Sequence, residues 1–464
     1  MYNKVIASNN NNDCEVEEFI IKLNTENLSA FLSYRDEGNM NIVVSVNSQE
    51  NEEKRVIRFK KILADDKAKC LDFADHKHEL INFVNFEQLL QKYFDNADKF
   101  TVVPKIVFLD VDVTDLNNFL KHDRPVSRQK AVIGSNFGLL YRDVAFLPKE
   151  IYTGNQPVNG TFKDTSTFCI EIKAKQGYLI NDEETLCVRK CRYCFYQYLK
   201  LKNEKINSVS SYCPIDLFSG TPERINRAIK GLMKNPQNNF KVFCDGKIVY
   251  NEYLKCQSSL HKILTNLFPN VERTERKEIL FVSLIRKILL KDFSFCDKNV
   301  EVSSFDDDDE NIHLRNCSMY EAWKSLPTNC ILNSILKTQL LVSENFSEME
   351  ILDKSKEPIN YDVNDQTILQ NYKIGSTALD CSIMLTFRRT TPTITTSECV
   401  NDTNHYITLK GPRGFYENFI VNATIVDLDL KKDSIAHFRK YKKQYHESKL
   451  AYFDFMEKHS KQNN

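Results

Sequence analysis

Alternating apolar and polar residues predict strands near the start of the chain. The alternation is regular over Asn41–Val46 and Val56–Phe59, which indicates two strands joined through a polar loop. A helix-spaced segment, NFEQLLQKYFDNA, follows, and a strand-like run is then broken by Pro104. The next segment, TDLNNFLKHD, predicts a short helix capped by Thr114 or Asp115. Strands and helices are therefore both expected in the first third of the chain.

A further regular alternation lies in FCIEIKAKQGYL, residues 168–179. Apolar residues occupy one face of the predicted strand, and Glu171, Lys173 and Lys175 occupy the other. A strand with three charges on one face is either an edge strand facing solvent or the floor of a polar site. The alternation alone leaves both interpretations open.

The segment SGTPERINRAIKGLM, residues 219–233, predicts a helix with clear start signals. Thr221 is suited to the N-cap, and Pro222 occupies the first helical position. The following PQNNFKVFCDGKIVY predicts a hairpin with Asp245 and Gly246 at its turn.

The remaining segments are of mixed character. Residues 300–312 are rich in aspartate and predict a solvated loop, whereas residues 345–372 are interpreted as an irregular insertion. Residues 381–389 and 419–432 predict two strands. A last helix is expected from about Ser434, and no internal repeat is visible.

The composition indicates a neutral, globular chain. Its 464 residues include 63 Lys and Arg and 63 Asp and Glu, and 42% of them are apolar. This length fits two or three domains or one large two-lobed fold. The zero net charge does not favour nucleic acid as a partner, and no apolar run of about 18 residues predicts a membrane span. Any anionic partner must therefore meet a local cluster of basic residues.

The 14 cysteines are scattered along the chain, which is typical of proteins in a reducing compartment. One CxxC pair, Cys191 and Cys194, lies in the helical segment CVRKCRYCFYQYLK. The sequence shows neither a second CxxC pair nor an HxxxH pair that would complete a zinc site. We therefore interpret this pair as buried thiols and expect no zinc.

Two groups of residues have the chemistry for binding phosphates. Gly38 lies in a turn between predicted strands and Arg58 on the next strand, an arrangement that suits a nucleotide loop with a neighbouring cation. Taken alone, an ordinary hairpin is the simpler interpretation of this turn. Lys173 and Lys175 project the same way and can meet one polyanion, although a solvated strand face has the same pattern.

Two aspartates add the chemistry of phosphoryl transfer. Asp427 ends an apolar strand, where a carboxylate is well placed for Mg²⁺. Asp380 precedes another strand and could accept a proton from a substrate hydroxyl. Each is an ordinary turn residue when it is considered alone. A phosphate-cradling loop, paired lysines and two such aspartates together make the set of parts that phosphoryl transfer requires.

Several motifs occur in an order that resembles the inositol-pentakisphosphate 2-kinase family. Between about residues 30 and 443 the chain contains YRDEGNMNIVV, VIRF, EIKAK, CRYCFYQYLK, YCPIDLFSG, PQNNFKVF, LDCSIML and VDLDLK. The resemblance implies an α+β, two-lobed fold distantly related to protein kinases, with an antiparallel sheet in the N-lobe and a larger mixed C-lobe. It divides the chain into a partly disordered lead at 1–28, an N-lobe at 29–145 and a C-lobe at 146–464.

The resemblance also implies a reaction. ATP would phosphorylate the 2-hydroxyl of inositol 1,3,4,5,6-pentakisphosphate and give inositol hexakisphosphate, with Mg²⁺ as the cofactor. Asp380 would be the catalytic base, Lys173 would neutralise the transferring phosphate, and Asp427 would bind Mg²⁺. The implied nucleotide contacts are Gly38, Asn39, Met40, Asn41, Arg58, Arg142, Asp143, Val144 and Glu171. The implied inositol phosphate contacts are Arg128, Lys173, Lys175, Lys200, Asn238, Asn239, Lys241, Lys431, Ser434 and Lys440, with Arg192 as a structural or gating partner.

The chain departs from the family pattern at a few positions. Ala174 replaces the proline of the signature E-x-K-P-K. Lys241 stands where arginine is usual, which exchanges a bidentate phosphate contact for a point charge. The segment after Lys431 is one residue short, and residues 345–372 lack the zinc ligands of plant-type members.

Two other functions fit parts of the same pattern. One is an inositol polyphosphate kinase with a different hydroxyl preference, and the other is a catalytically inactive scaffold that binds inositol phosphates. The intact Asp380, Asp427 and paired lysines favour an enzyme. We expect a monomer in the cytoplasm or nucleus, without a nucleic-acid or membrane partner.

Overall fold

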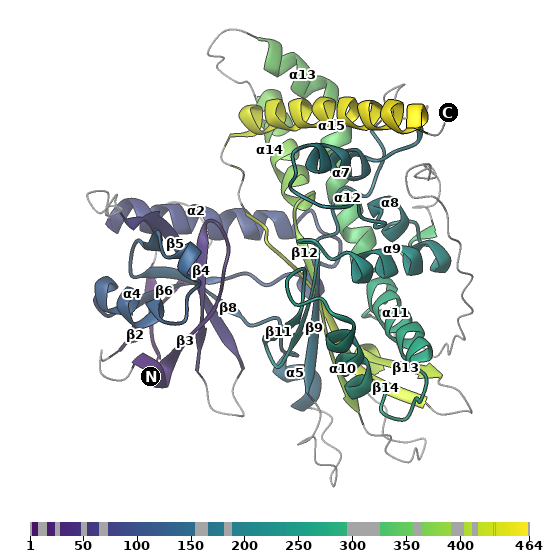
Figure 1. Ribbon diagram of the computed structural model, residues 1–464. Coiled ribbons are helices and arrows are strands. Elements are labelled where there is room, and N and C mark those ends of the chain that lie inside the picture. The colour runs from purple at the N-terminus through teal and green to yellow at the C-terminus, as the bar shows by residue number, and fades with distance from the viewer. Residues whose placement is uncertain are drawn as a thin grey trace. The chain divides into compact units, whose positions relative to one another are not determined.

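The computed structural model of the chain has two compact units (Figure 1). The first comprises Met1–Lys92 and Thr101–Val144, and the second comprises Tyr93–Phe100 and Ala145–Asn464. The structure describes residues 2–7, 16–23, 28–47, 53–64, 73–153, 166–180, 188–294, 325–355, 363–390, 403–410, 416–429, 431 and 433–462.

An eight-stranded sheet forms the first unit. Its strand order is β1-β2-β6-β8-β5-β4-β3, and β7 pairs with β5. The β2–β6 pair is parallel and the other pairs are antiparallel. The strands are β1 (Tyr2–Ala7), β2 (Val16–Lys22), β3 (Leu32–Glu37), β4 (Asn41–Val46), β5 (Arg55–Leu63), β6 (Lys105–Asp110), β7 (Ala131–Ile133) and β8 (Phe137–Arg142).

The predicted alternation in β4 and β5 is confirmed, because Ile42, Val44, Ile57 and Phe59 are all buried in the core of this unit. Four helices accompany the sheet within the described part of this unit. They are α1 (Leu28–Phe31), α2 (Phe73–Gln91), α4 (Val113–Lys121) and the 3₁₀ helix η3 (Val126–Arg128).

The cap of α4 differs from the prediction. Asp112 caps this helix, and its Oδ1 accepts a hydrogen bond from the Thr114 N–H at 2.6 Å. Thr114 and Asp115 therefore lie inside the first turn.

The second unit contains a six-stranded sheet in the order β11-β10-β9-β12-β14-β13. Every pair in it is antiparallel. The strands are β9 (Thr167–Ile172), β10 (Phe240–Cys244), β11 (Lys247–Tyr250), β12 (Ser382–Thr390), β13 (Tyr406–Lys410) and β14 (Tyr416–Val426). The predicted hairpin around Asp245 and Gly246 is the β10–β11 pair, and both turn residues have positive φ, 46° and 78°.

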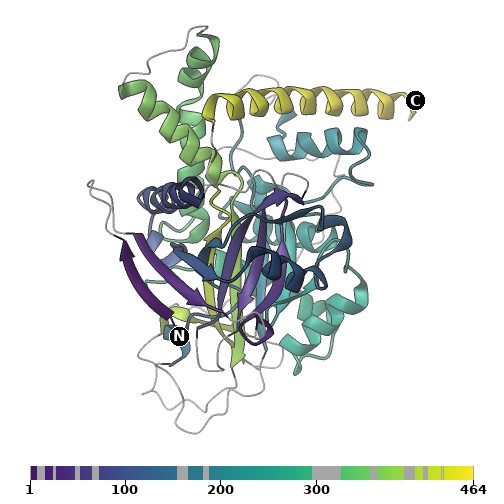
Figure 2. The same cartoon turned by 90° about the vertical axis from the view of Figure 1, so that its left-hand side faces the viewer.

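Helices make up most of the rest of the second unit. α7 lies alongside α15, and α12 contacts α14 (Figures 1 and 2). The helices are α3 (Ala97–Phe100), α5 (Lys149–Thr153), α7 (Arg192–Lys202), α8 (Pro214–Leu217), α9 (Pro222–Lys234), α10 (Gln257–Leu267), α11 (Thr274–Leu290), α12 (Ile331–Glu344), α13 (Phe346–Lys354), α14 (Val363–Ala378), η6 (Thr403–His405) and α15 (Ser434–Gln462). Within the described residues, none of these helices combines the length and the apolar character that a membrane span needs.

Three predictions about local structure need correction. The described part of 345–372 is not irregular, because it contains α13 and the first ten residues of α14. The strand predicted over 168–179 ends at Ile172, and β9 is a central strand that is buried along its whole length, so it is not a solvent-facing edge. Residues 1–28 were assigned to a lead, yet they contain β1 and β2.

Two predicted helices are confirmed, and one predicted loop lies outside the described residues. The helix over 219–233 is confirmed as α9, and the last helix begins at Ser434 as expected. The acidic loop at 300–312, including residues 305–310, lies outside the described residues.

Candidate active site

The predicted catalytic residues of the second unit meet at one edge of its sheet. β9, β12 and β14 are neighbours, and Glu171 on β9 pairs in register with Lys241 on β10 and with Met384 on β12. Lys173 directly follows β9, Asp380 precedes β12, and Asp427 directly follows β14. Because antiparallel strands bring opposite ends together, residues that are about 250 positions apart in sequence reach the same edge.

Positive and negative side chains alternate in this cluster. The Lys173 ammonium lies 3.5 Å from Asp427 and 4.0 Å from Glu171. On the other side of Glu171, its second oxygen lies 3.0 Å from the Lys241 ammonium. A second group joins Lys175 to Asp380 at 3.2 Å and Lys431 to the other Asp380 oxygen at 3.6 Å.

The backbone that carries Lys175 departs from the strand. Lys175 has a φ of +62°, in the left-handed region that costs a non-glycine residue about 1 kcal/mol or more. Buried Gln339 of α12 stabilises this turn, since its Nε2 donates to the Lys175 carbonyl at 2.9 Å and its Oε1 accepts from the Gly177 N–H at 2.9 Å. The same Nε2 donates to the Ala378 carbonyl at 3.0 Å, which ties the Lys175 turn to the segment before Asp380.

Asp380 is held in its ionised form. Desolvation opposes its ionisation, but the charges of Lys175 and Lys431, with the hydrogen bond from Lys175, hold the pKa of Asp380 below its ordinary value. A carboxylate with a low pKa is a weak base that orients a hydroxyl more readily than it removes its proton early.

The oxygens around Asp427 fit a magnesium ion. The Ser382 hydroxyl donates to Asp427 Oδ2 at 2.8 Å and lies 3.4 Å from Glu171 Oε1. Asp427 has a φ of +61°, another left-handed conformation of a non-glycine residue at this edge. Two carboxylates and a hydroxyl are the hard oxygen donors that Mg²⁺ prefers. Asp427 and Glu171 would hold the ion.

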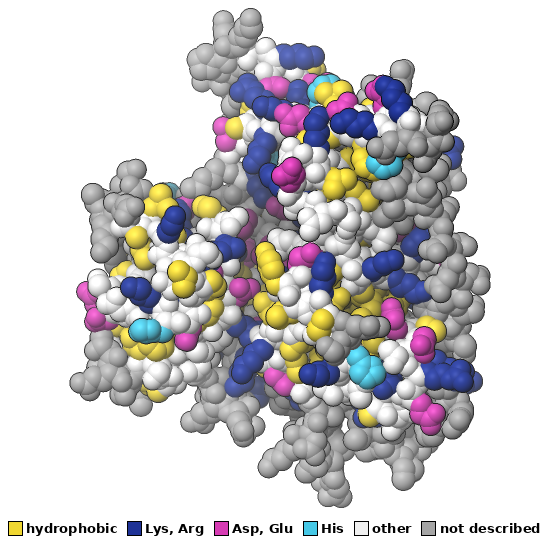
Figure 3. All heavy atoms as spheres, viewed as in Figure 1, with side chains coloured by type: hydrophobic (Ala, Val, Ile, Leu, Met, Phe, Trp, Pro, Cys, Tyr) yellow, Lys and Arg dark blue, Asp and Glu magenta, His cyan; other side chains and the backbone are white. Residues whose placement is uncertain are grey.

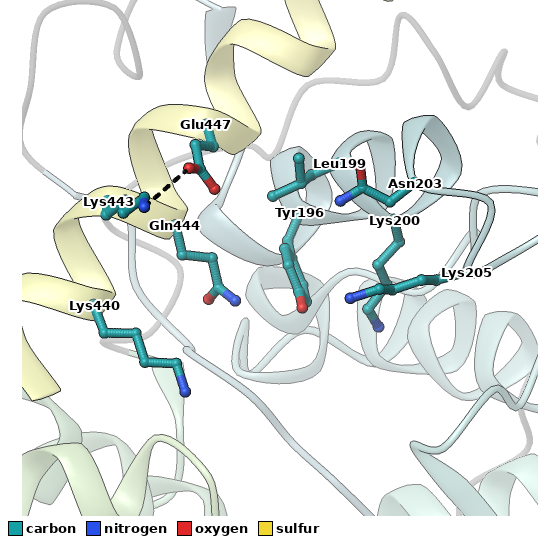
Figure 4. A pocket seen from close by; sticks show the side chains of 9 residues that line it. All are labelled: Tyr196, Leu199, Lys200, Asn203, Lys205, Lys440, Lys443, Gln444 and Glu447. Atoms are coloured by element: carbon teal, nitrogen blue, oxygen red, sulfur yellow. Dashed lines mark ion pairs between the residues drawn. The ribbon is translucent and has the colours of Figure 1, made fainter.

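A basic pocket lies between α7 and α15 (Figure 4). Lys200 and Lys440, two of the predicted inositol phosphate contacts, line it from the two helices. Lys205 and Lys443 also line this pocket and were absent from the sequence prediction. The close-up shows the ammonium groups of Lys200 and Lys440 pointing toward the space between the helices.

Burial and neighbouring positive charges lower the pKa of one lysine in this pocket. Burial, followed by the charges of Lys175 and Lys205, lowers the pKa of Lys200 to about 8. The pocket lining includes a single carboxylate, Glu447, which lies 4.0 Å from Lys443. Excess positive charge in a confined space favours an anionic ligand with several charges.

The other predicted contacts of the second unit have mixed environments. Asn239 is buried, and its Nδ2 donates to the Tyr193 hydroxyl at 2.9 Å, whereas Asn238 is exposed. The Asn239 carbonyl accepts from the Lys173 N–H at 3.0 Å. Ser434 donates its hydroxyl to the Leu369 carbonyl at 3.3 Å.

Arg192 joins the two helices of the basic pocket. Its guanidinium lies 4.2 Å from the Tyr441 ring centroid, and its Nη2 donates to Gln444 Oε1 at 2.5 Å. Because Arg192 begins α7 and both partners lie on α15, it fixes how these helices pack. The structural or gating role that the family resemblance implies for Arg192 stays a prediction.

The predicted nucleotide loop forms a tight hairpin in the first unit. The Gly38 N–H donates to the Asn41 carbonyl at 3.0 Å, and a Cβ at Gly38 would meet no atom within 4 Å. With its amide oxygen facing the guanidinium, Asn41 accepts from Arg58 Nε at 2.9 Å and from Nη2 at 2.6 Å. Arg128 donates to Asn39 Oδ1 at 3.0 Å, so the structure brings a predicted inositol phosphate contact next to this loop.

A buried ion pair supports the same hairpin. Arg124 donates to both oxygens of Glu37, at 3.0 and 2.9 Å, and Lys61 contacts Glu37 and donates to the Gly38 carbonyl at 2.8 Å. Burial favours neutral Glu37, but the hydrogen bonds from Arg124 and Lys61 hold its pKa below the ordinary value. Arg124 and Lys61 carry no sequence signal that predicts this role.

The remaining predicted nucleotide contacts also lie in the first unit. Met40 is exposed, with 62% of its surface accessible, in the turn between β3 and β4. Arg142 ends β8, and Asp143 lies 3.3 Å from Arg35. Val144 is the last residue of the unit.

Comparison with known proteins gives the same family as the sequence motifs. The sequence model of the family described as inositol-pentakisphosphate 2-kinase matches residues 34–447. The chain is 27% identical to an inositol-pentakisphosphate 2-kinase of Danio rerio, over 86% of this chain and 88% of that protein. It is 28% identical to one of Oryza sativa subsp. indica, over 88% of this chain and 90% of that protein.

A third relative, an inositol-pentakisphosphate 2-kinase of Arabidopsis thaliana, is 31% identical over 47% of this chain and 52% of its own length. The family match covers most of the chain, including every predicted site residue. The chain belongs to the inositol-pentakisphosphate 2-kinase family of kinases.

Proposed function

We propose that this protein transfers the γ-phosphate of ATP to the 2-hydroxyl of inositol 1,3,4,5,6-pentakisphosphate and produces inositol hexakisphosphate. The observation that carries this proposal is the array of alternating lysines and carboxylates at the sheet edge, with the basic pocket nearby. Lys173, Asp427 and Glu171 form one half of the array, and Lys175, Lys431 and Asp380 form the other.

The charge of the reactants explains why such an array is needed. Five phosphates at about −1.5 to −2 each give the acceptor a charge of roughly −7 to −10. Mutual repulsion between this acceptor and ATP opposes their approach. Lys173 and Lys175 place positive charge at the strand end, and Lys200 and Lys440 place it in the pocket. Electrostatic positioning is also the main contribution that a protein makes to phosphoryl transfer.

Each residue of the array has a distinct role in the proposal. Lys173 neutralises the transferring phosphate, and Lys175 and Lys431 hold Asp380 while they face the acceptor. Asp380 orients the acceptor hydroxyl and takes its proton late in the transfer, as its low pKa requires. Mg²⁺, when bound by Asp427 and Glu171, supplies charge neutralisation to the nucleotide phosphates.

The first unit contributes the nucleotide loop in this proposal. The Asn41–Arg58 contact fixes a guanidinium beside the Gly38 turn, where it can hold a phosphate. Arg128 is positioned by Asn39 at the same turn.

The test is a reaction of the purified full chain with ATP, Mg²⁺ and inositol pentakisphosphate. Anion-exchange chromatography should show inositol hexakisphosphate, and NMR should assign the new phosphate to the 2-position. A new phosphate at another position, obtained with an isomeric acceptor, would support a kinase of different hydroxyl preference. Tight inositide binding without any product would instead indicate an inactive scaffold.

A further inference from the structure

Three thiols converge beside the candidate active site. The Sγ atoms of Cys191, Cys194 and Cys213 all lie within 4.8 Å of one another. Cys191 and Cys213 are fully buried, whereas Cys194 is partly exposed. Cys213 lies 19 residues beyond Cys194 in the sequence, so spacing alone does not reveal the group. The expectation of no zinc rested on the CxxC pair without a second pair and on residues 345–372, and it left Cys213 out.

We infer that these three cysteines form a binding site for one Zn²⁺ ion. A tetrahedral zinc ion with Zn–S bonds of about 2.3 Å holds its sulfurs roughly 3.8 Å apart. Sulfurs already within 4.8 Å of one another therefore reach this geometry by side-chain shifts of about 1 Å or less. The partly exposed Cys194 marks the side from which the ion enters and where water completes the fourth position.

The local backbone favours thiolates at this place. Cys191 is the N-cap of α7, an 11-residue helix, and its Sγ accepts a hydrogen bond from the Cys194 N–H at 3.5 Å. The positive end of a helix dipole and a donated N–H both stabilise a thiolate. The three thiols release three protons when they bind Zn²⁺, and the resulting centre carries a net charge of −1.

A metal accounts for the group better than the alternatives. A disulfide uses two sulfurs and would leave the third cysteine without a role, whereas a metal ion uses all three. Packing of cysteines as small apolar residues does not require three sulfurs within 4.8 Å of one another. Thiolate sulfur is also the ligand type that selects zinc over the hard cations.

The site would support the active-site backbone. Tyr193 lies between the two cysteines of the CxxC pair, and its hydroxyl accepts from the Asn239 side chain. Tyr212 precedes Cys213, and its hydroxyl donates to the Ala174 carbonyl at 2.6 Å, between the two signature lysines. The two tyrosine rings pack edge to face, with centroids 5.3 Å apart. A zinc ion bound to the flanking cysteines would therefore fix both tyrosines.

The experiment measures metal in the purified full chain. Elemental analysis after dialysis should find about one zinc per chain. Substitution with Co²⁺ should give the near-ultraviolet absorption of thiolate-to-cobalt charge transfer. The variants Cys194→Ser and Cys213→Ser should lose most of the bound zinc and this absorption. Cys330→Ser is the matched control, because Cys330 is also a buried N-cap cysteine but lies outside the cluster; it should keep both.

Several outcomes would overturn the inference. The first is wild-type protein that is purified without zinc and takes up none in competition with a chromophoric chelator. The second is a Cys213→Ser variant that keeps all of its zinc. The third is wild-type protein that contains copper in place of zinc. An intact mass lower than that of the reduced chain by two hydrogen atoms, without metal, would show a disulfide instead. The chelator competition uses the wild-type chain, so it remains decisive where a serine variant fails to fold.

Discussion

At the scale of single residues, the site depends on carboxylates and lysines that control one another's charge. Asp380 stays ionised because Lys175 and Lys431 contact its two oxygens. Lys173 has Asp427 and Glu171 as its partners, and these carboxylates balance its charge. Lys173, Lys175 and Lys431 are therefore each paired with a carboxylate of the site.

Replacing Asp380 with asparagine should separate catalysis from binding. The amide keeps the shape but cannot accept the hydroxyl proton, so kcat should fall by about 10²-fold or more. Inositide affinity should be unchanged or higher, because the variant removes a negative charge from between two lysines. Steady-state kinetics and calorimetric binding measure the two effects. A kcat within about threefold of wild type would remove Asp380 from the proposed mechanism.

The pKa of Lys200 predicts a pH dependence of inositide binding. Lys200 is protonated below about pH 8 and loses its charge as the pH rises through that value. A polyanion binds the charged form, so inositide affinity should decrease above about pH 8. His437 does not contribute in this range, because burial, with the charges of Lys431 and Arg192, lowers its pKa to about 4. Binding titrations from about pH 6.5 to 9.5 check this.

The matched variant for this pH effect is Lys200→Arg, which stays charged over the whole range. Its affinity should decline less than that of the wild type. Identical pH profiles for the two proteins would show that Lys200 does not titrate in the pocket.

At the scale of elements, α12 positions two segments of the candidate active site through one side chain. Gln339 is fully buried, and its amide contacts the backbone at Lys175, Gly177 and Ala378. Its removal would leave several buried polar backbone groups without partners, each at a cost of about 1–3 kcal/mol.

The variant Gln339→Leu should therefore lose stability and activity together. We expect a loss of about 2–4 kcal/mol in the free energy of unfolding and a clear decrease in kcat. Thr338→Val on the same helix is the control, because Thr338 Oγ1 bonds the Tyr93 and Ser334 carbonyls instead. It should lose stability while its kcat stays near wild type. Chemical denaturation and steady-state assays measure both; equal kcat in the two variants would contradict the positioning role.

The basic pocket makes a second prediction at this scale. Lys205→Ala combined with Lys443→Ala should weaken inositide binding about tenfold, because two cations of the pocket are lost. Lys202→Ala is the control on α7, since Lys202 pairs with Asp454 at 2.9 Å and does not line the pocket. Calorimetry measures the inositide affinity of the wild type, the double variant and Lys202→Ala. Equal affinities would show that inositide binding depends on other residues.

The sequence predicted elements well where local signals exist. Thr221 and Pro222 give α9 a clear start, and Asp245 with Gly246 sets the β10–β11 turn. α14 escaped prediction although Asp362 and Asp365 mark its start, because its buried face depends on tertiary packing. Gly375 shows this, since a Cβ there would lie 2.8 Å from Val342 Cγ2 of α12.

Only part of the site could be predicted, because the rest also depends on tertiary packing. The motif residues at the strand ends were identifiable, but the left-handed turn at Lys175 has no glycine to signal it. Cys213, Gln339 and Lys205 reach their neighbours only through folding, so one-dimensional spacing could not reveal them.

At the scale of the whole molecule, the neutral total conceals an uneven distribution of charge. Lysine and arginine side chains gather over the region of α15 in the space-filling view, with acidic residues among them (Figure 3). The 63 basic and 63 acidic residues cancel in sum, while the pocket lining has four lysines and one glutamate.

This distribution predicts a strong effect of salt on a neutral protein. Ions at about 0.1 M screen charges beyond roughly 10 Å, so raising the salt concentration should weaken inositide binding and affect folding stability little. Binding titrations at several salt concentrations check the effect on inositide affinity, and thermal unfolding at the same concentrations checks the effect on stability. A salt-independent dissociation constant would contradict an electrostatic pocket.

The place of α15 in the chain has a consequence for biosynthesis. This helix packs on α7 through Tyr445 and Tyr452 and supplies Lys440 to the basic pocket, yet it follows all the strands of both sheets in the chain, so a ribosome makes it after them. A nascent chain that has reached residue 433 already contains every strand of both sheets and the Asp380 and Asp427 segments. A premature stop codon just before Ser434 would therefore yield a chain that keeps Asp380 and Asp427 but lacks the pocket residues that α15 supplies.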